Sequence, residues 1–318
     1  MNFVAALNEA AAKNLRVLED QIELAIGEDP FVFEACAPLF KGGKRLRPML
    51  FLLCANSKTF CPNEKTMPLA VALELIHTAS LVHDDIIDTS KTRRGVETAN
   101  SKYGAQIAVL TGDYLFAKAF QLVAENNYDA QVTSTLSKLV KNLCVGEIMQ
   151  DRRLFTVPTL EEYYTQINLK TAIFLSSCCR LGGIVAKTDA GEIENLAAYG
   201  TGLGLAFQIT DDLLDFFGDE KVTGKPRGGD LKSGVITLPV IRALETSKKS
   251  SELREIVTGA GSVDEAIKII LETDAVDWCT ARAKAHIESA LVNLPFTLKT
   301  SVTLALEQIA SFVVDRTR

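Results

Sequence analysis

The sequence predicts an all-α protein, and two observations carry that prediction. Apolar residues recur at three- and four-residue steps through most of the chain, as in "AALNEAAAKNLRVLEDQIELAI" near its start, which is the spacing of a buried helix face. The period-2 alternation of half-buried strands is scarce, and many glycines and prolines gather in short segments between the helical stretches.

The helical stretches follow one another without a domain linker. After the first, over 5–26, we expect helices near 48–56, 67–88, 104–126, 129–150, 159–186, 190–217, 236–246, 262–291 and 299–315. The segments between them are "FKGGKRLRP", "CPNEK", "TRRG", "FTVPTL" and "GDEKVTGKPRGGDLKSG". Because no low-complexity tract or repeat of fixed period separates the halves, we expect a single domain over 1–318.

Composition excludes several classes of function. The net charge of −6 and the absence of a long basic run disfavour non-specific nucleic-acid binding. The seven cysteines form no C-x-x-C and no zinc spacing, which predicts reduced core thiols in a cytoplasmic protein. The N-terminus lacks a signal-peptide pattern, and the longest apolar runs, such as "MLFLLCA", are far shorter than the ~20 residues of a membrane span.

Two segments each place three aspartates on an apolar helix. "LVHDDIIDTS" and "QITDDLLDFFGD" both contain D-D-x-x-D, and neither has a lysine or arginine at a helical position that would pair with it. The first and last aspartates of each set share a helix face, where like charges repel. A solvated acidic face is the alternative for one such set, but the repetition favours a shared hard cation such as Mg²⁺. The six residues are Asp84, Asp85, Asp88, Asp211, Asp212 and Asp215.

Basic, glycine-containing loops accompany these aspartates. "KGGKRLRP" precedes the first set, "SKTRRG" follows it, and "GKPRGGDLKSG" follows the second. Glycine lets a backbone approach a ligand closely, and arginine and lysine suit phosphate oxygens. One such loop alone is typical of a plain turn. Three of them beside two acidic sets predict a metal-assisted diphosphate site.

The chain resembles the trans-polyprenyl diphosphate synthases, which elongate isoprenoid chains head to tail. The segments that carry the resemblance occur in the family's order: "GGKRLRP", "LIHTASLVHDDIID", "TGDYLFAKAF", "GEIMQD", "KTA", "FQITDDLLD" and "GKPRGGDL" with "TLP" after it. The resemblance implies an all-α fold of isoprenoid synthase type, a large, mostly antiparallel helical bundle around a deep central cavity. It also implies a homodimer.

The resemblance further implies roles for named residues. The two aspartate sets are expected to hold Mg²⁺ ions, two or three per site, with Mn²⁺ as a substitute. Residues that match contacts to the allylic diphosphate are Arg93, Lys170, Thr171, Gln208 and Lys225. Residues that match the isopentenyl diphosphate pocket are Lys44, Arg47, His77 and Arg94. The expected catalytic set is Asp84, Asp85, Asp88, Arg93, Lys170, Asp211, Asp212 and Lys225. The alternative for His77 is a hydrogen-bonded core residue, and His83, next to Asp84, is expected to be structural or to support a neighbouring site residue.

These residue types suit one reaction. Metal ions and basic side chains stabilise the departing diphosphate of the allylic substrate, and the double bond of isopentenyl diphosphate attacks the resulting carbocation. An apolar cavity protects that cation from water. No Ser-His-Asp or cysteine nucleophile is needed, and the sequence offers no such constellation.

Product length is predicted from two small residues. In the resembled family, bulky aromatics four or five residues before the first aspartate set stop the chain early, and here Ala79 and Ser80 occupy those positions. We therefore expect a long product, of about C30 or above on the family's pattern. Close helix packing is the alternative reason for the small residues, and Phe116 and Phe120 are candidates for a deeper block.

One departure from the family pattern bears on partners. "DLKSGVITLP" has Val235 where the family commonly has lysine, and Lys232 stands three residues earlier. Some long-chain synthases that work with a small partner subunit also lack that lysine, so dependence on such a subunit stays open. The motifs are also compatible with a farnesyl or geranylgeranyl synthase, a class I terpene cyclase or a non-catalytic helical subunit. A cytoplasmic enzyme that visits the membrane to release its product is the expected localisation.

Overall fold

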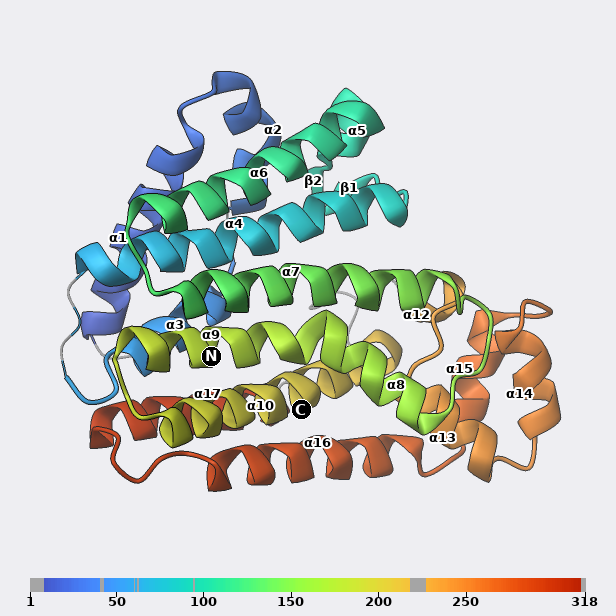
Figure 1. Ribbon diagram of the computed structural model, residues 1–318. Coiled ribbons are helices and arrows are strands. Elements are labelled where there is room, and N and C mark those ends of the chain that lie inside the picture. The colour runs from blue at the N-terminus through green and yellow to red at the C-terminus, as the bar shows by residue number, and fades with distance from the viewer. Residues whose placement is uncertain are drawn as a thin grey trace. The chain divides into compact units, whose positions relative to one another are not determined.

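The computed structural model describes residues 9–40, 43–59, 61, 63–93, 95–217 and 227–315. Within these ranges the chain is helical apart from one two-stranded antiparallel hairpin, which confirms the all-α prediction. The elements in chain order, all but η2 labelled in Figure 1, are α1 (Glu9–Ile26), α2 (Pro30–Phe40), α3 (Leu46–Ala55), α4 (Asn63–Ile87), β1 (Thr92–Arg93), β2 (Val96–Glu97), α5 (Ala99–Tyr103), α6 (Ala105–Glu125), α7 (Ala130–Asp151), α8 (Leu160–Ile167), the π-helical turn η2 (Asn168–Ala172), α9 (Ile173–Val185), α10 (Ala190–Phe217), α12 (Gly229–Lys232), α13 (Leu238–Thr246), α14 (Ser250–Val257), α15 (Val263–Leu271), α16 (Ala275–Val292) and α17 (Thr300–Asp315).

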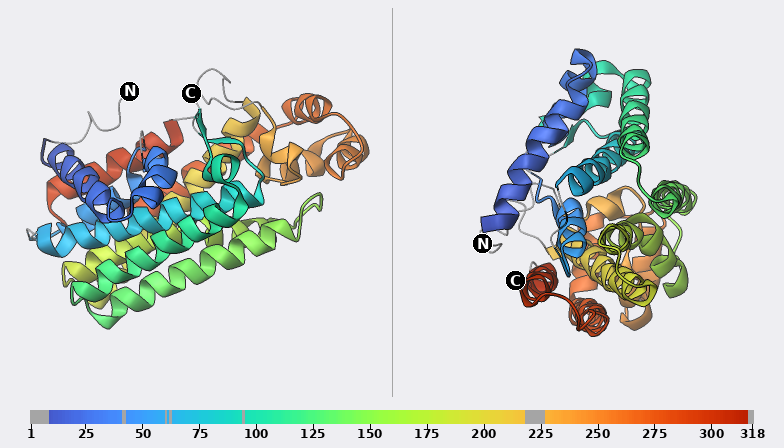
Figure 2. Two further views of the ribbon diagram at one scale, coloured as in Figure 1. Left: turned by 90° about the horizontal axis from the view of Figure 1, so that it is seen from above. Right: turned by 60° about the vertical axis from the view of Figure 1, so that its left-hand side comes forward.

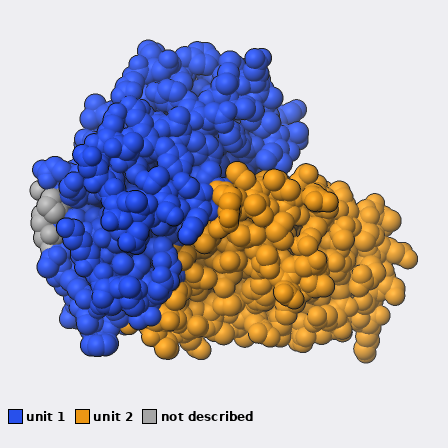
Figure 3. Space-filling view, in the orientation of Figure 1, with its two compact units in different colours: residues 1–140, 177–197, 295–308 blue, residues 141–176, 198–294, 309–318 orange. Residues whose placement is uncertain are grey.

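The chain divides into two compact units, which Figure 3 shows in different colours. Unit 1 comprises residues 1–140, 177–197 and 295–308, and unit 2 comprises 141–176, 198–294 and 309–318. The first aspartate set belongs to unit 1 and the second to unit 2. The single domain expected over 1–318 stays a prediction.

The core of unit 1 forms around α4. This helix packs along α6, and the two run antiparallel side by side (Figures 1 and 2). Helix α4 is buried almost all round, including Leu69, Leu73 and Ile76, which are fully inaccessible to solvent. A helix that is buried on most sides needs apolar residues around most of its circumference, not only along one face. Helix α4 has this composition.

In unit 2, glycines of α10 let neighbouring backbones approach closely. A Cβ on Gly204 would lie 2.4 Å from Cα of Ala172 in η2, and one on Gly202 would lie 2.8 Å from the carbonyl oxygen of His286 in α16. A side chain at either position would force the helices apart. Glycine at these sites therefore fixes where α10 lies against η2 and α16.

Two long helices predicted from the sequence are interrupted. The helix expected over 262–291 forms two separate helices, α15 and α16. The break lies at Thr273, whose hydroxyl donates to the carbonyl of Ile270 and accepts from the N–H of Ala275. The helix expected over 159–186 contains the π-helical turn η2. Helices α2, α5, α12 and α14 and the hairpin were not predicted, since they are short or, in α2, almost entirely apolar without a period.

Among the described residues, two helices are long and apolar enough to cross a membrane by length and composition alone. They are α4 and α6, and 72% of the apolar window of α4 and 39% of that of α6 are buried within the protein. The sequence prediction counted uninterrupted apolar runs and so missed both. Burial of α4 is what a core helix of a globular protein shows.

The cysteines are all free thiols. Cys36, Cys54, Cys178, Cys179 and Cys279 are buried, as the sequence predicts for core thiols, whereas Cys61 is half-buried and Cys144 is exposed on α7. Burial raises the pKa of the Cys36 and Cys279 thiols to about 12. These two thiols are therefore protonated and unreactive at neutral pH.

Candidate active site

The first aspartate set lies at the C-terminal end of α4. A helix C-terminus carries a partial negative charge, and α4 has no basic residue in its last turn. Asp84 is half-buried, Asp88 is exposed, and Asp85 is only 2% exposed. Three carboxylates at the negative end of a helix need a positive partner from elsewhere in the fold.

Arg93 supplies one such partner for Asp85. Its Nε donates a hydrogen bond of 2.8 Å to Oδ1 of Asp85, and the carboxylate is buried in this ion pair. The hairpin brings Arg93 back toward α4: Arg93 pairs with Val96, and Gly95 adopts a φ of 76° in the tight turn between the strands. Arg94 lies outside the described residues, so its predicted role stays a prediction.

The basic residues of the loop before α3 differ in their surroundings: one is buried in a structural contact, and the others are accessible. Arg45 adopts a left-handed conformation (φ 50°) and is buried, with Nη1 2.8 Å from Oε2 of Glu74 on α4. Its other amino group donates to the carbonyl of Phe40. Lys44 is exposed, and Arg47 is half-buried with Nη1 3.3 Å from Nε2 of His77. The structure thus brings Arg47 and His77 together, as the resemblance implies, and assigns Arg45 to holding the loop.

The second aspartate set lies in the last two turns of α10. This helix also has no basic residue in its last turn. Asp212 is 1% exposed, and it accepts hydrogen bonds from the Tyr163 hydroxyl at 2.6 Å and from Nε2 of Gln208 at 2.8 Å. Burial, followed by the negative charge of Asp230, raises the pKa of Asp212 to about 8. Both of these donors are neutral groups, and in the metal-free protein Asp212 is therefore protonated at neutral pH.

The π-helical turn η2 carries Lys170 and Thr171. π-turns insert one extra residue into a helix and occur often at functional sites. Thr171 donates from its hydroxyl to Oε1 of Gln208 at 2.6 Å, which connects it through Gln208 to Asp212. Lys170 Nζ lies 2.6 Å from Oε2 of Glu147 and 3.1 Å from Oε1 of Gln150. Four of the predicted residues of unit 2 thus lie in or next to one hydrogen-bonded group.

Asp215 has a contact that the sequence did not predict. Its carboxylate accepts from the N–H groups of Gly229 and Asp230 at 3.1 and 3.2 Å, so it caps the start of α12. Asp211 is half-buried one turn before it. The metal role predicted for Asp215 is not tested by this contact. Lys225 lies outside the described residues.

Val235 lies three residues after the end of α12. Its N–H donates to the carbonyl of Asp230, and its side chain is half-buried. Lys232, the candidate replacement for the missing lysine, is exposed and donates to the carbonyl of Arg227 at 3.3 Å. Its charge therefore stays near the start of α12.

The residues predicted to set product length lie on α4. Ala79 is fully buried, and Ser80 is half-buried with its hydroxyl donating to the carbonyl of His77 in its own helix. His83 packs on α6, because a Cβ on Gly112 would come within 2.2 Å of its Nε2. Its ring centroid is 5.8 Å from that of Phe116. His83 thus serves packing, consistent with the structural role expected for it.

The donor set fits a hard divalent cation by chemistry. Both sets offer only carboxylate oxygens, at helix ends where backbone carbonyls add negative charge, and Mg²⁺ prefers oxygen ligands. Among the described residues, no three carboxylate, imidazole or thiol groups converge closely enough to hold a metal ion as they stand. Asp85 and Asp212 are engaged with Arg93 and Tyr163, respectively. Mg²⁺ completes its shell with water and substrate phosphate, so a few carboxylates suffice.

Sequence reasoning missed several side chains of this site. Tyr163, Glu147, Gln150 and Asp230 all contact or influence predicted residues, yet none was singled out. Glu147 and Gln150 stand in the segment "GEIMQD" and Asp230 in "GKPRGGDL", which were recognised only as segments. For Tyr163 the only available signal was a tyrosine on the apolar face of an expected helix.

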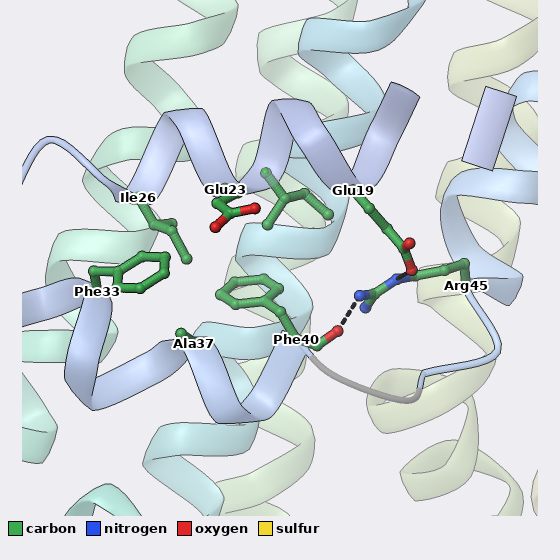
Figure 4. A pocket seen from close by; sticks show the side chains of 8 residues that line it. Glu19, Glu23, Ile26, Phe33, Ala37, Phe40 and Arg45 are labelled. Carbon is green, nitrogen blue, oxygen red and sulfur yellow. Dashed lines mark hydrogen bonds and ion pairs between the residues drawn. The ribbon is translucent and has the colours of Figure 1, made fainter. Parts of the chain in front are cut away.

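A separate cavity of about 340 Å³ lies between α1 and α2 in unit 1 (Figure 4). Its walls are apolar, including Ile26, Phe33 and Phe40, and Arg45 closes one end. Glu19 and Glu23 line it as well, and the charge of Arg45 is already paired with Glu74. Arg45 Nε also lies 3.8 Å from Oε1 of Glu19, so this single guanidinium is shared by two carboxylates, the lining is net negative, and the cavity does not suit a diphosphate.

Comparison with known proteins identifies the family. The profile of the family described as Polyprenyl synthetase matches residues 29–273, more than half of the chain. The chain belongs to the polyprenyl synthetase family. This confirms the resemblance carried by the aspartate sets and the basic loops. The protein is a polyprenyl diphosphate synthase, a prenyltransferase that elongates isoprenoid chains with isopentenyl diphosphate.

Members of the synthetase family with different products resemble this chain. Component 2 of heptaprenyl diphosphate synthase from Geobacillus stearothermophilus is 36% identical over 90% of this chain and 90% of that protein. A short chain isoprenyl diphosphate synthase from Methanocaldococcus jannaschii is 38% identical over 81% of this chain and 80% of that protein. The crystal structure of a polyprenyl synthase from Caulobacter crescentus CB15, complexed with calcium and isoprenyl diphosphate, has a TM-score of 0.90, 30% identity and 99% and 98% coverage of the two chains. The fold is that of the isoprenoid synthases.

Proposed function

We propose that this synthase condenses an allylic diphosphate with isopentenyl diphosphate, head to tail and with Mg²⁺, to give a long-chain product. The single observation that carries the proposal is the hydrogen-bonded group formed by Thr171, Gln208 and Asp212 in unit 2. It places two residues expected to contact the allylic diphosphate next to a residue expected to bind metal. A solved relative that carries calcium and isoprenyl diphosphate supports the same ligand classes.

The side chains of unit 1 receive isopentenyl diphosphate in this proposal. Lys44 is exposed and Arg47 is half-buried beside His77, so both can donate to phosphate oxygens. The buried pair of Arg45 with Glu74 holds the loop that presents them. Arg94 has the same proposed role.

The side chains of unit 2 hold the allylic diphosphate. Lys170 and Thr171 are presented by the π-turn, and Lys170 exchanges its contact with Glu147 for the diphosphate when substrate binds. Gln208 orients both Thr171 and Asp212. Arg93 and Lys225 have the same proposed role.

The six aspartates of the two sets would hold the cations, with Mn²⁺ able to replace Mg²⁺. When bound, such ions stabilise the negative charge that develops on the departing diphosphate. The protein contributes carboxylates held in fixed orientations: Asp85 by Arg93, and Asp212 by Tyr163 and Gln208. The negative ends of α4 and α10 add to the attraction for cations.

A long product is supported by Ala79 and Ser80, whose small side chains leave no aromatic floor before the first aspartate set. A relative named for a heptaprenyl product agrees with this, and one named for short-chain products gives the alternative. Phe116 or Phe120 on α6 is the candidate stop if the product is short.

The proposal also covers the domain organisation, the assembly and the location of the enzyme. We infer one synthase domain over 1–318, because the family match runs through residues of both units. A homodimer is the expected assembly. Val235 and the relative named component 2 support testing for a small partner subunit. The proposed location is the cytoplasm, with product release at the membrane surface.

A product assay on the purified chain alone tests the function. The protein receives farnesyl diphosphate, labelled isopentenyl diphosphate and Mg²⁺, with a parallel sample in chelator, and the products are resolved by length. A metal-dependent ladder that ends at about C30 or longer is the expected result.

Other outcomes change the proposal in defined ways. A product that stops at three or four isoprene units keeps the enzyme class and contradicts the assignment to Ala79 and Ser80. No elongation by the chain alone, with substrate still bound, indicates a missing partner subunit, and Val235→Lys is then the first variant to assay. Elongation in chelator contradicts the metal requirement.

A further inference from the structure

Tyr163 is buried behind the second aspartate set and is not one of the proposed substrate contacts. Its side chain in α8 is 2% exposed, and its hydroxyl donates a hydrogen bond of 2.6 Å to Oδ2 of Asp212. A buried tyrosine hydroxyl needs an acceptor, and here the acceptor is a carboxylate that is itself 1% exposed. The contact joins residues 49 positions apart in the sequence.

Gln208 holds the other oxygen of the same carboxylate. Its Nε2 donates to Oδ1 of Asp212 at 2.8 Å from one helical turn earlier, and its own oxygen accepts from Thr171. With one donor on each oxygen, the plane and direction of the Asp212 carboxylate are fixed. A carboxylate has about four lone-pair positions, so each oxygen keeps a further one for another ligand.

We propose that Tyr163 is a positioning residue for Asp212: its hydroxyl, with the Gln208 amide, orients the carboxylate to bind a divalent cation. This inference rests on the proposed function, in which Asp212 is a metal ligand. Neutral donors suit the task because they orient the carboxylate without bringing a positive charge that would compete with the cation. Hydrogen-bond partners of metal ligands typically change metal affinity by about 10–100-fold.

The neighbouring tyrosine provides a matched control. Tyr164 is half-buried, and its ring contacts those of Tyr163 and His286, each with centroids 5.5 Å apart. Tyr163→Phe and Tyr164→Phe remove the same atom from adjacent positions and keep both rings. Only the first removes a hydrogen bond from Asp212.

The experiment measures Mn²⁺ binding to the full chain without prenyl substrates. Free Mn²⁺ is followed by electron paramagnetic resonance, with and without inorganic pyrophosphate, at a temperature where circular dichroism shows all proteins folded. We expect Tyr163→Phe to bind Mn²⁺ about 10-fold more weakly than the natural chain and Tyr164→Phe to bind it with little change. A role in packing alone would lower the unfolding temperature without changing this affinity. Tyr163→Met provides a second variant without the hydroxyl if the first does not fold.

The outcomes separate this inference from the proposed function. If the natural chain and Tyr163→Phe bind Mn²⁺ equally, or if Tyr164→Phe weakens binding as much, the positioning role is wrong. If the natural chain binds Mn²⁺ but makes no elongated product, the proposed function fails and the ratio of affinities still decides the role of Tyr163. If the natural chain binds no Mn²⁺ even with pyrophosphate, both fall.

Discussion

The two aspartate sets share one sequence pattern but are supported in different ways. In each, the middle aspartate is almost fully buried: Asp85 is 2% exposed and Asp212 is 1% exposed. Asp85 is paired with the guanidinium of Arg93, whereas Asp212 is held by the neutral groups of Tyr163 and Gln208. A cation on the first set meets a carboxylate already paired with a guanidinium, whereas one on the second must displace the proton that Asp212 keeps up to about pH 8. Identical motifs therefore need not bind metal equally well.

The largest effect is expected from replacing either buried aspartate. Asp85→Asn and Asp212→Asn keep the side-chain shape and remove a proposed metal ligand, and a bound metal contributes several kcal/mol to transition-state stabilisation. Each variant should therefore lose about 10³-fold in the rate of isopentenyl diphosphate incorporation. Asp20→Asn, on the exposed face of α1, is the control and should retain activity. Loss in only one of the two variants would show that one set works alone.

Removing the Arg93 guanidinium beside the first set should lower the free energy of unfolding more than removing the Tyr163 hydroxyl beside the second set. Arg93→Gln leaves Asp85 buried without its positive partner, and breaking such a pair costs about 3 kcal/mol of unfolding free energy. Tyr163→Phe removes a hydrogen bond to a carboxylate and should cost about 2 kcal/mol. Urea denaturation measures both. The double variant with Asp85→Asn should regain part of the loss of Arg93→Gln, and strictly additive losses would contradict the ion pair.

Replacing Gly204 near the second set should lower the free energy of unfolding more than replacing Gly112 near the first set, as measured by urea denaturation. A Cβ on Gly204 meets backbone of Ala172 at 2.4 Å, which cannot move aside, so Gly204→Ala should destabilise by about 3 kcal/mol. A Cβ on Gly112 meets the His83 ring, which can turn away, so Gly112→Ala should cost about 1 kcal/mol. Gly191→Ala is the control, because its nearest neighbour, Oδ1 of Asp189, is 3.3 Å away. Equal losses at Gly204 and Gly112 would show that both sets are packed with the same rigidity.

A pH dependence specific to the second set is also expected. The metal-free folded protein keeps the proton on Asp212 up to about pH 8, whereas the unfolded chain releases it near pH 4. Unfolding free energy should therefore fall as the pH rises between these values, by up to about 1.4 kcal/mol per pH unit from this group, and level off above pH 8. Comparing denaturation from pH 6 to pH 9 with that of Asp212→Asn isolates the contribution. A variant with the same slope as the natural chain would contradict the raised pKa.

The sequence predicted the local features of this protein better than the distant ones. The all-α fold and most helices followed from apolar spacing, and both aspartate sets were found because they repeat. The break at Thr273 was missed because a threonine hydroxyl, not a glycine or proline, ends the helix. The π-turn at Lys170 has no signature in apolar spacing that distinguishes it from ordinary helix.

The sequence also did not predict which residues far apart in the chain contact one another. Arg93 was expected to bind substrate, but that it also neutralises Asp85 depends on a hairpin too short to predict. The support of Asp212 by Tyr163 depends on how α8 packs against α10 in three dimensions. Arg45 and Arg47 are two residues apart and look equivalent in sequence, yet one is buried against Glu74 and the other lies beside His77.

The most direct test of the central claim is a crystal structure of the full chain with Mn²⁺ and inorganic pyrophosphate. Anomalous scattering from manganese locates the ions without ambiguity. The account predicts ions bound by carboxylate oxygens of both aspartate sets, with Tyr163 still donating to Asp212 and Arg93 still paired with Asp85. Ions at one set only, or none at either while pyrophosphate is bound by basic side chains alone, would contradict it.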